Sequence, residues 1–189
     1  MASSWERLAN VTLGSDGSTL SSGTFTAKKH LRVVAWVNGN GSSSVGNLNM
    51  RLGNGTVDTG SNYGHIYSAN GNSGVTQTSQ TAIRVHDDAG NDNARYFMEM
   101  VISNIASNEK LVQVHSIQVG STGAGTAPIR GEVVGKWANT SDQINVISLI
   151  AGTSFLAGSV ITVWGADDQG STAKDKSSIT NVPEGTRYE

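Results

Sequence analysis

The fold of this chain is decided by residues 129–165, which read IRGEVVGKWANTSDQINVISLIAGTSFLAGSVITVWG. The apolar residues of this stretch fall into three runs of strand length, separated by two segments that are typical of turns. The runs are Val133, Val134 and Trp137, then residues 144–150, then residues 160–164, with turns at residues 139–142 and 157–159. Valine and isoleucine predominate, and their branched side chains favour the pleated surface of a sheet. The stretch therefore predicts three β-strands.

Strand patterns of the same kind recur along the rest of the chain. Residues 31–37, LRVVAWV, are almost continuously apolar, so we expect a central strand with both faces covered. Residues 96–105 and 111–120 alternate with a period of two, and His115 is expected to point into or beside the core. No helical period is sustained over three turns. About nine or ten strands at this spacing predict an all-β protein, a single antiparallel β-sandwich of two packed sheets.

The last part of the chain differs in composition from the rest. Small and charged residues fill residues 166–189, and the bulky apolar residues there are Ile179, Val182 and Tyr188. Pro183 begins a Pro-Glu-Gly segment that fits a turn. We therefore expect a β-sandwich domain over residues 1–165, followed by an extended C-terminal arm or linker over residues 166–189. If this segment is an arm, we expect it to contact a neighbouring subunit through Ile179, Val182, Pro183 and Tyr188.

Composition narrows the classes of partner. The net charge is −2 and the basic residues are scattered, which disfavours binding to nucleic acid. The absence of cysteine excludes disulfides and thiolate metal sites. No apolar run reaches the roughly 20 residues needed to span a membrane. No signal peptide is visible in the first residues, MASSWERLANVTL, so we expect synthesis and assembly in a cytoplasm.

Motifs for catalysis or cofactor binding do not stand out. The four histidines lack the HExxH spacing, and no G-x-S-x-G sequence supports a hydrolase nucleophile. Residues 120–125 resemble a phosphate loop in glycine content, but a strand is expected after Pro128, where a phosphate loop would open a helix. The acidic turn at residues 87–92 fails the EF-hand pattern because Ala89 stands at a ligand position. We therefore predict no enzyme, no metal and no cofactor.

A polar region over residues 38–81 is the best candidate for binding by loops. Within it, residues 48–52 alternate and are expected to form a half-buried strand, whereas residues 56–81 are polar and rich in glycine, asparagine and tyrosine, and we expect long surface loops there. Tyr63, His65 and Tyr67 fall on one face of a possible strand, and aromatic rings beside amides suit contact with a partner or a host glycan. The alternative, which we favour, is an aromatic face packed on the sandwich. The tryptophans fit either core packing or contacts between subunits: Trp5, Trp36, Trp137 and Trp164.

Several short motifs resemble small structural proteins of the virions of tailed phages and environmental viruses. They are Trp5-Glu6-Arg7-Leu8, Leu31-Arg32-Val33-Val34, Gly135-Lys136-Trp137, Ser148-Leu149, Phe155, Gly158-Ser159-Val160-Ile161 and Trp164-Gly165. The ending from Pro183 to Glu189 is similar to connectors in marine viral structural proteins. The chain departs from this pattern in its longer region 38–81.

The resemblance implies a single jelly-roll-like β-sandwich that decorates the virion. The expected function is that of a capsid decoration or cement protein, which contacts the major capsid protein or other virion subunits and forms a dimer or trimer. One alternative is a tail-fibre or appendage tip that binds a host glycan through residues 38–81. Another alternative, from a different class, is a carbohydrate-binding module of a cellular enzyme.

Overall fold

The computed structural model describes residues 4–39, 47–86, 95–119 and 123–168, and this part of the chain contains strands and no helix. The prediction of an all-β protein is therefore confirmed. The strands are β1 (Glu6–Thr12), β2 (Gly17–Thr24), β3 (His30–Asn38), β4 (Leu48–Asn54), β5 (Thr56–Val57), β6 (Tyr63–Ala69), β7 (Val75–Gln80), β8 (Ile83–His86), β9 (Arg95–Ser103), β10 (Lys110–Gln118), β11 (Ile129–Trp137), β12 (Val146–Phe155) and β13 (Val160–Ala166). They outnumber the nine or ten expected, because β5 and β7 lie where long loops were predicted and β6 was expected only as a possible strand.

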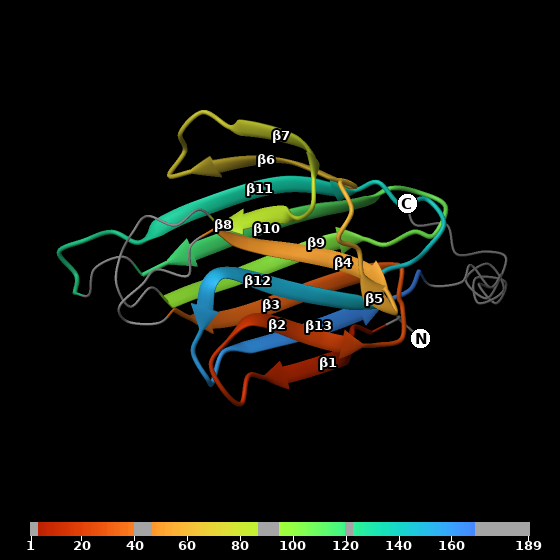
Figure 1. Ribbon diagram of the computed structural model, residues 1–189, viewed down its shortest axis with the longest axis horizontal. Helices are drawn as coiled ribbons and strands as arrows, with labels where there is room; N and C mark the ends of the chain where they lie inside the picture. The colour runs from red at the N-terminus through yellow and green to blue at the C-terminus, as the bar shows by residue number, and fades with distance from the viewer. Residues whose placement is uncertain (1–3, 40–46, 87–94, 120–122, 169–189) are drawn as a thin grey trace, which may run out of the picture.

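The strands form two antiparallel sheets that pack face to face, as the sequence predicted (Figure 1). The larger sheet has eight strands in the order β1-β13-β3-β9-β10-β11-β6-β7. The smaller has the order β2-β12-β4-β5, with β8 paired to β4. Each of these pairings is antiparallel, so the architecture is an open β-sandwich.

The chain passes repeatedly from one sheet to the other. Strands β1, β3, β9 and β13 belong to the large sheet, whereas β2, β4, β8 and β12 belong to the small one. Within this set the neighbours are β1-β13-β3-β9 in one layer and β2-β12-β4-β8 in the other. This arrangement of eight strands is that of a jelly roll. Strands β10, β11, β6 and β7 then extend the large sheet beyond it.

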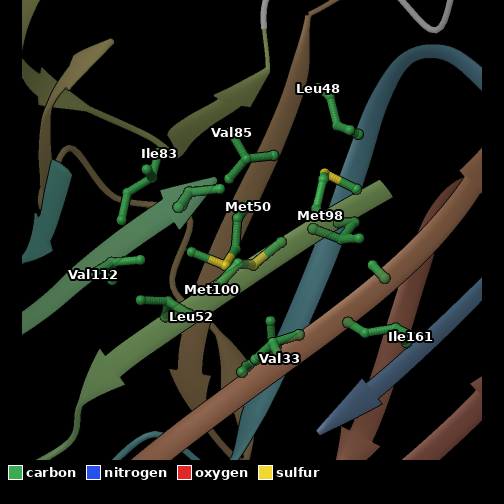
Figure 2. Packing of buried hydrophobic residues seen from close by; sticks show 14 of the residues in the cluster. Val33, Leu48, Met50, Leu52, Ile83, Val85, Met98, Met100, Val112 and Ile161 are labelled. Atoms are coloured by element: carbon green, nitrogen blue, oxygen red, sulfur yellow. The ribbon is translucent and has the colours of Figure 1, made fainter. Parts of the chain in front are cut away.

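The core lies between the two sheets. Every second residue of β3, β9 and β10 is buried, which places Val33 and Met100 on the inner face of the large sheet. Figure 2 shows Met50 and Leu52 of β4 packed against this inner face. The alternation predicted for residues 96–105 is confirmed, because Tyr96, Met98, Met100 and Ile102 are all buried.

The outer face of β3 is uncovered, contrary to the expectation for residues 31–37. Arg32 and Trp36 are exposed and Val34 is half-buried, although β3 is hydrogen-bonded on both edges. The prediction of a strand within the sheet is correct, but the prediction that both of its faces are covered is wrong for this chain alone. A continuous apolar run is typical of a strand covered on both faces. Here the smaller sheet covers one face of β3, and side chains on its other face are exposed to water.

His115 also differs from its expected position, because it points outward from β10. The residues that point inward are Ser116 and Gln118, which lie 2.7 Å and 3.1 Å from the two ring nitrogens of the buried His86. Apolar residues occur on both faces of β10, with Leu111 outside and others inside. Alternation therefore did not identify which face is the core.

One buried lysine joins two loops at one end of the large sheet. Lys110 is fully buried, and its ammonium group donates to three backbone carbonyls at 3.2, 2.6 and 2.8 Å. Those carbonyls belong to Ala106, Asn108 and Asn139. Each N–H therefore has an acceptor, as a buried charge requires.

The connection between β5 and β6 is held by Asp58. Its carboxylate accepts hydrogen bonds from the Trp137 indole N–H at 2.8 Å, from Asn62 at 2.8 Å and from the Gly60 backbone N–H at 2.7 Å. Partial burial alone would raise the pKa of Asp58. The three hydrogen bonds outweigh burial, so the pKa lies below its ordinary value.

We predict that Asp58→Asn lowers the free energy of unfolding by about 1.5–3 kcal/mol at pH 7, because an amide cannot accept at both oxygen positions. A depressed folded pKa stabilises the fold above the unfolded pKa of about 4, and this contribution is lost as pH falls through the folded pKa. Urea unfolding at pH 7 and at a series of acidic pH values should therefore show the two proteins converging in stability on acidification. Equal stability of both proteins at pH 7 would contradict this role.

Candidate interaction surface

The predicted glycan contacts on β6 lie inside the sandwich. Tyr63, His65 and Tyr67 are 1%, 6% and 4% exposed. The Tyr63 hydroxyl accepts a hydrogen bond from the Leu52 N–H at 3.1 Å, and the carbonyls of Leu52 and Asp58 lie within 2.9 Å as acceptors. Burial raises the pKa of Tyr63. These side chains form the packed aromatic face that we favoured. The alternative prediction, that they contact a partner or a glycan at the surface, is wrong because they are buried.

The environment of His65 suits a neutral imidazole. Burial lowers its pKa, and the nearby Arg84 guanidinium lowers it further. The ring is thus part of the packed interior between β6 and the smaller sheet. It is not presented to a ligand.

Several other predicted features lie outside the described residues. They are the arm contacts Ile179, Val182, Pro183 and Tyr188, and the acidic turn at residues 87–92. Within residues 4–39, 47–86, 95–119 and 123–168, no group of three or more histidine or acidic residues is arranged to hold a metal ion. The same residues include no helix long and apolar enough to cross a membrane.

One serine–histidine pair has the residue types of a catalytic nucleophile and its base, but the pair is not accessible to solvent. Ser116 and His86 are both fully buried, with 2.7 Å between the hydroxyl oxygen and the ring nitrogen Nδ1. The Ser116 hydroxyl also lies 3.0 Å from the Val85 carbonyl oxygen. A substrate has no route to this hydroxyl, so the pair serves packing.

The surface that stands out is the outer face of the eight-stranded sheet. One row of directly opposed residues crosses four neighbouring strands: Val160 faces Trp36, Trp36 faces Phe97, and Phe97 faces Ile117. Trp36 is 42% exposed, Phe97 43% and Ile117 45%. Two aromatic and two aliphatic side chains therefore form a continuous apolar row in contact with water.

A second, partly apolar row runs parallel to the first. Val101 faces Gln113, Gln113 faces Val134, and Val134 faces Ile66. The three aliphatic members are each between 45% and 56% exposed. The apolar character of the outer face thus extends from β13 to β6.

Charges of both signs lie between and beside these rows. Glu99 forms an ion pair with Arg32 at 2.7 Å, and Glu132 lies 3.7 Å from Arg130. His115 stands between the two glutamates, opposite both of them in the register. The outer face therefore carries no strong net charge.

The outer face of the smaller sheet differs in composition. Its outward residues on β2 and β4 are Thr19, Ser21, Asn49 and Arg51. All the exposed large apolar residues within the described strands belong to the larger sheet. A single-sided apolar surface of this extent is typical of an interaction site, since monomeric proteins rarely expose large contiguous apolar patches.

The four tryptophans differ in their exposure. Trp137 is 2% exposed and belongs to the core. Trp36 and Trp5 are exposed, and Trp164 is half-buried beside Trp5 in an open hollow with Arg32 and Val34. The outer face was missed as a site because only its tryptophans were singled out. The signal that identifies it is the presence of apolar residues on both faces of β3, β9 and β10.

We predict that Tyr63→Phe lowers the free energy of unfolding by about 1–3 kcal/mol, because backbone groups of Leu52 and Asp58 lose their partner. The matched control is Ile66→Thr on the outward face of the same strand, which should change stability by about 0.5 kcal/mol or less. Chemical denaturation of the purified variants measures both. An unchanged stability of Tyr63→Phe would sink the structural assignment of this side chain.

Searches with protein-family models, among curated proteins and among solved structures found no match to this chain. The case for the outer face therefore rests on its geometry and chemistry.

Proposed function

We propose that this chain is a non-enzymatic structural subunit of a virus particle, a decoration or cement protein that acts by burying surface against neighbouring protein. The observation that carries the proposal is the outer face of the eight-stranded sheet, with Trp36, Phe97, Ile117, Val101 and Val134 exposed on adjacent strands. Aromatic and aliphatic side chains in a flat, open array suit protein contact.

The size of the outer face fits such a role. Six strands, β13 to β6, lie about 4.8 Å apart and are each about 24 Å long, which gives a face of roughly 700 Å². A stable interface of standard size buries about 800 Å² on each partner. One copy supplies a modest contact, and many copies on a shell stabilise it together, because each binds the assembled form in preference to the disassembled one.

The fold and the sequence motifs support the same class. The strand arrangement is that of a jelly roll, a fold that is common in viral capsid proteins and also occurs in lectin domains and cupins. Fold alone does not imply function. The resemblance of the short motifs around Trp5, Trp137 and Trp164 to virion proteins supports the virion among these settings.

A second candidate function, a glycan-binding appendage tip, is favoured by one local feature. An open hollow of about 430 Å³ is lined by Trp36, Asn38, Gly39, Arg95 and Leu156. An exposed indole beside an amide and a guanidinium suits a sugar. The aliphatic residues that dominate the rest of the outer face do not, which is why we place this function second.

The two candidates predict different copy numbers. Quantitative mass spectrometry of purified particles should find hundreds of copies of a decoration protein, in a fixed ratio to the major capsid protein that reflects the symmetry of the shell. Antibody labelling should then cover the head. A few copies clustered at the tail would contradict the cement function and favour the appendage tip.

A glycan array with the purified chain provides the complementary measurement. Under the cement function the chain binds no glycan. Specific binding that is lost in Arg95→Ala, with folding unchanged, would replace the cement function by the glycan-binding one.

A further inference from the structure

We propose that the outer face of the eight-stranded sheet is a homodimer interface, in which two copies of this chain pack outer face against outer face about a two-fold axis. The proposal deepens the proposed function by naming the neighbouring protein that covers this face, a second copy of the chain, so that the subunit would decorate the particle as a pair and meet the shell through other surfaces. The dimer itself is argued from the structure alone. Only its place on a virus particle rests on the proposed function.

The first argument is the uncovered side of the central strands. β3 and β9 lie inside the sheet and are hydrogen-bonded on both edges, yet Trp36, Phe97 and Val101 remain between 42% and 49% exposed. Two sheets pack about 10 Å apart when side chains from both faces interdigitate. A second copy placed on this face would add two more layers and would cover residues that one chain alone leaves in water.

The second argument is self-complementarity. A two-fold interface brings the same surface together with itself, so a face of one charge sign would repel its copy. This face carries Arg32, Arg130 and Lys136 together with Glu99 and Glu132. The charges are of both signs, and the apolar rows cover more of the face than the charges do. A second copy rotated about a two-fold axis can therefore place apolar rows against apolar rows.

The third argument concerns the edges of the sheet, which are poorly suited to the alternative of edge-to-edge pairing. The register of β1 against β13 shifts between Arg7 and Ala9, and that of β7 against β6 shifts between Tyr63 and His65. Ser79, on edge strand β7, has a positive φ of 53°. Irregular edges of this kind discourage continuation of the sheet into another molecule. The face is left as the surface for association.

The area of the face is close to what a stable dimer needs. The roughly 700 Å² of the face approaches the roughly 800 Å² that each partner buries in a standard interface. Anchors near the centre of an interface carry most of its free energy, and Phe97 and Val101 lie on β9, one of the two central strands.

The test is sedimentation of the full chain from about 1 to about 100 µM, a range that brackets micromolar affinity. The wild-type chain should sediment as a species of twice the chain mass of 19.7 kDa. The double variant Phe97→Lys and Val101→Lys should raise the dissociation constant at least about 100-fold, because each of the two chains brings two unpaired charges to the centre of the interface. The matched control Thr19→Lys, on the outer face of the smaller sheet, should dimerise like the wild type. Circular dichroism confirms that each variant folds.

A crosslinking experiment gives a readout that does not depend on those variants. The chain has no cysteine, so His115→Cys on central strand β10 introduces a single thiol on the proposed interface. A short bis-maleimide should link two copies of His115→Cys efficiently, and should not link two copies of Thr19→Cys.

Three outcomes would overturn the proposal: a wild-type monomer at every concentration, an unchanged dimer in the double variant, or equal crosslinking of the two cysteine variants. These results are separable from the copy-number test. A monomer in solution that decorates particles in hundreds of copies would remove the dimer and leave the proposed function. A face-to-face dimer in solution that is absent from particles would remove the proposed function and leave the dimer.

Discussion

The packing of two sheets of unequal size around one shared core is the interaction on which the rest of the structure depends. Residues 129–165 hold both sheets together, because they supply β11 in the extension of the large sheet, β12 within the small one and β13 between β1 and β3. The inner faces cover each other, and buried methionine, leucine and valine side chains from both layers fill the space between them. Without this contact neither sheet has a dry face, and the buried Tyr63 and His86 lose their environment.

The same packing determines where binding is feasible. The smaller sheet covers one face of the larger and leaves its other face in water. Trp36, Phe97, Ile117, Val101 and Val134 then form an exposed apolar surface, whereas the outward residues of β2 and β4 in the smaller sheet are polar. Ser116 and His86, which have the residue types of a catalytic pair, are fully buried and pack in the core. Among the described residues, the exposed large apolar side chains are therefore concentrated on the outer face of the larger sheet, the surface that we propose for recognition.

Much of the fold was predictable from local patterns, and the site was not. The alternation of Tyr96 to Ile102 and the three runs of residues 129–165 predicted strands correctly, because branched and aromatic side chains at a period of two have few other solutions. Around residues 63–67 only a possible strand was expected, and residues 75–80 were expected as a loop, because the glycine and asparagine content of this region masked the strands β6 and β7. Tyr63 and Tyr67 suited a surface or a core equally well, and only the tertiary fold places them inside. The role of Lys110, which donates to carbonyls of two separate loops, has no signature in local sequence. The outer face was missed for a related reason: where both sides of a strand are apolar, sequence does not say which side a single chain covers.

The central claim is that the outer face of the eight-stranded sheet is covered by protein when the chain functions. Hydroxyl-radical footprinting tests it most directly, because it reports the solvent exposure of individual side chains in the free and assembled states. The account predicts that Trp36 and Phe97 react readily in a dilute sample of the free chain. On assembly they should become at least about tenfold less reactive, because a buried side chain is reached neither by water nor by the radical. The buried Trp137 should be protected in both states. Equal reactivity of Trp36 and Phe97 in the free and assembled chain would contradict the account.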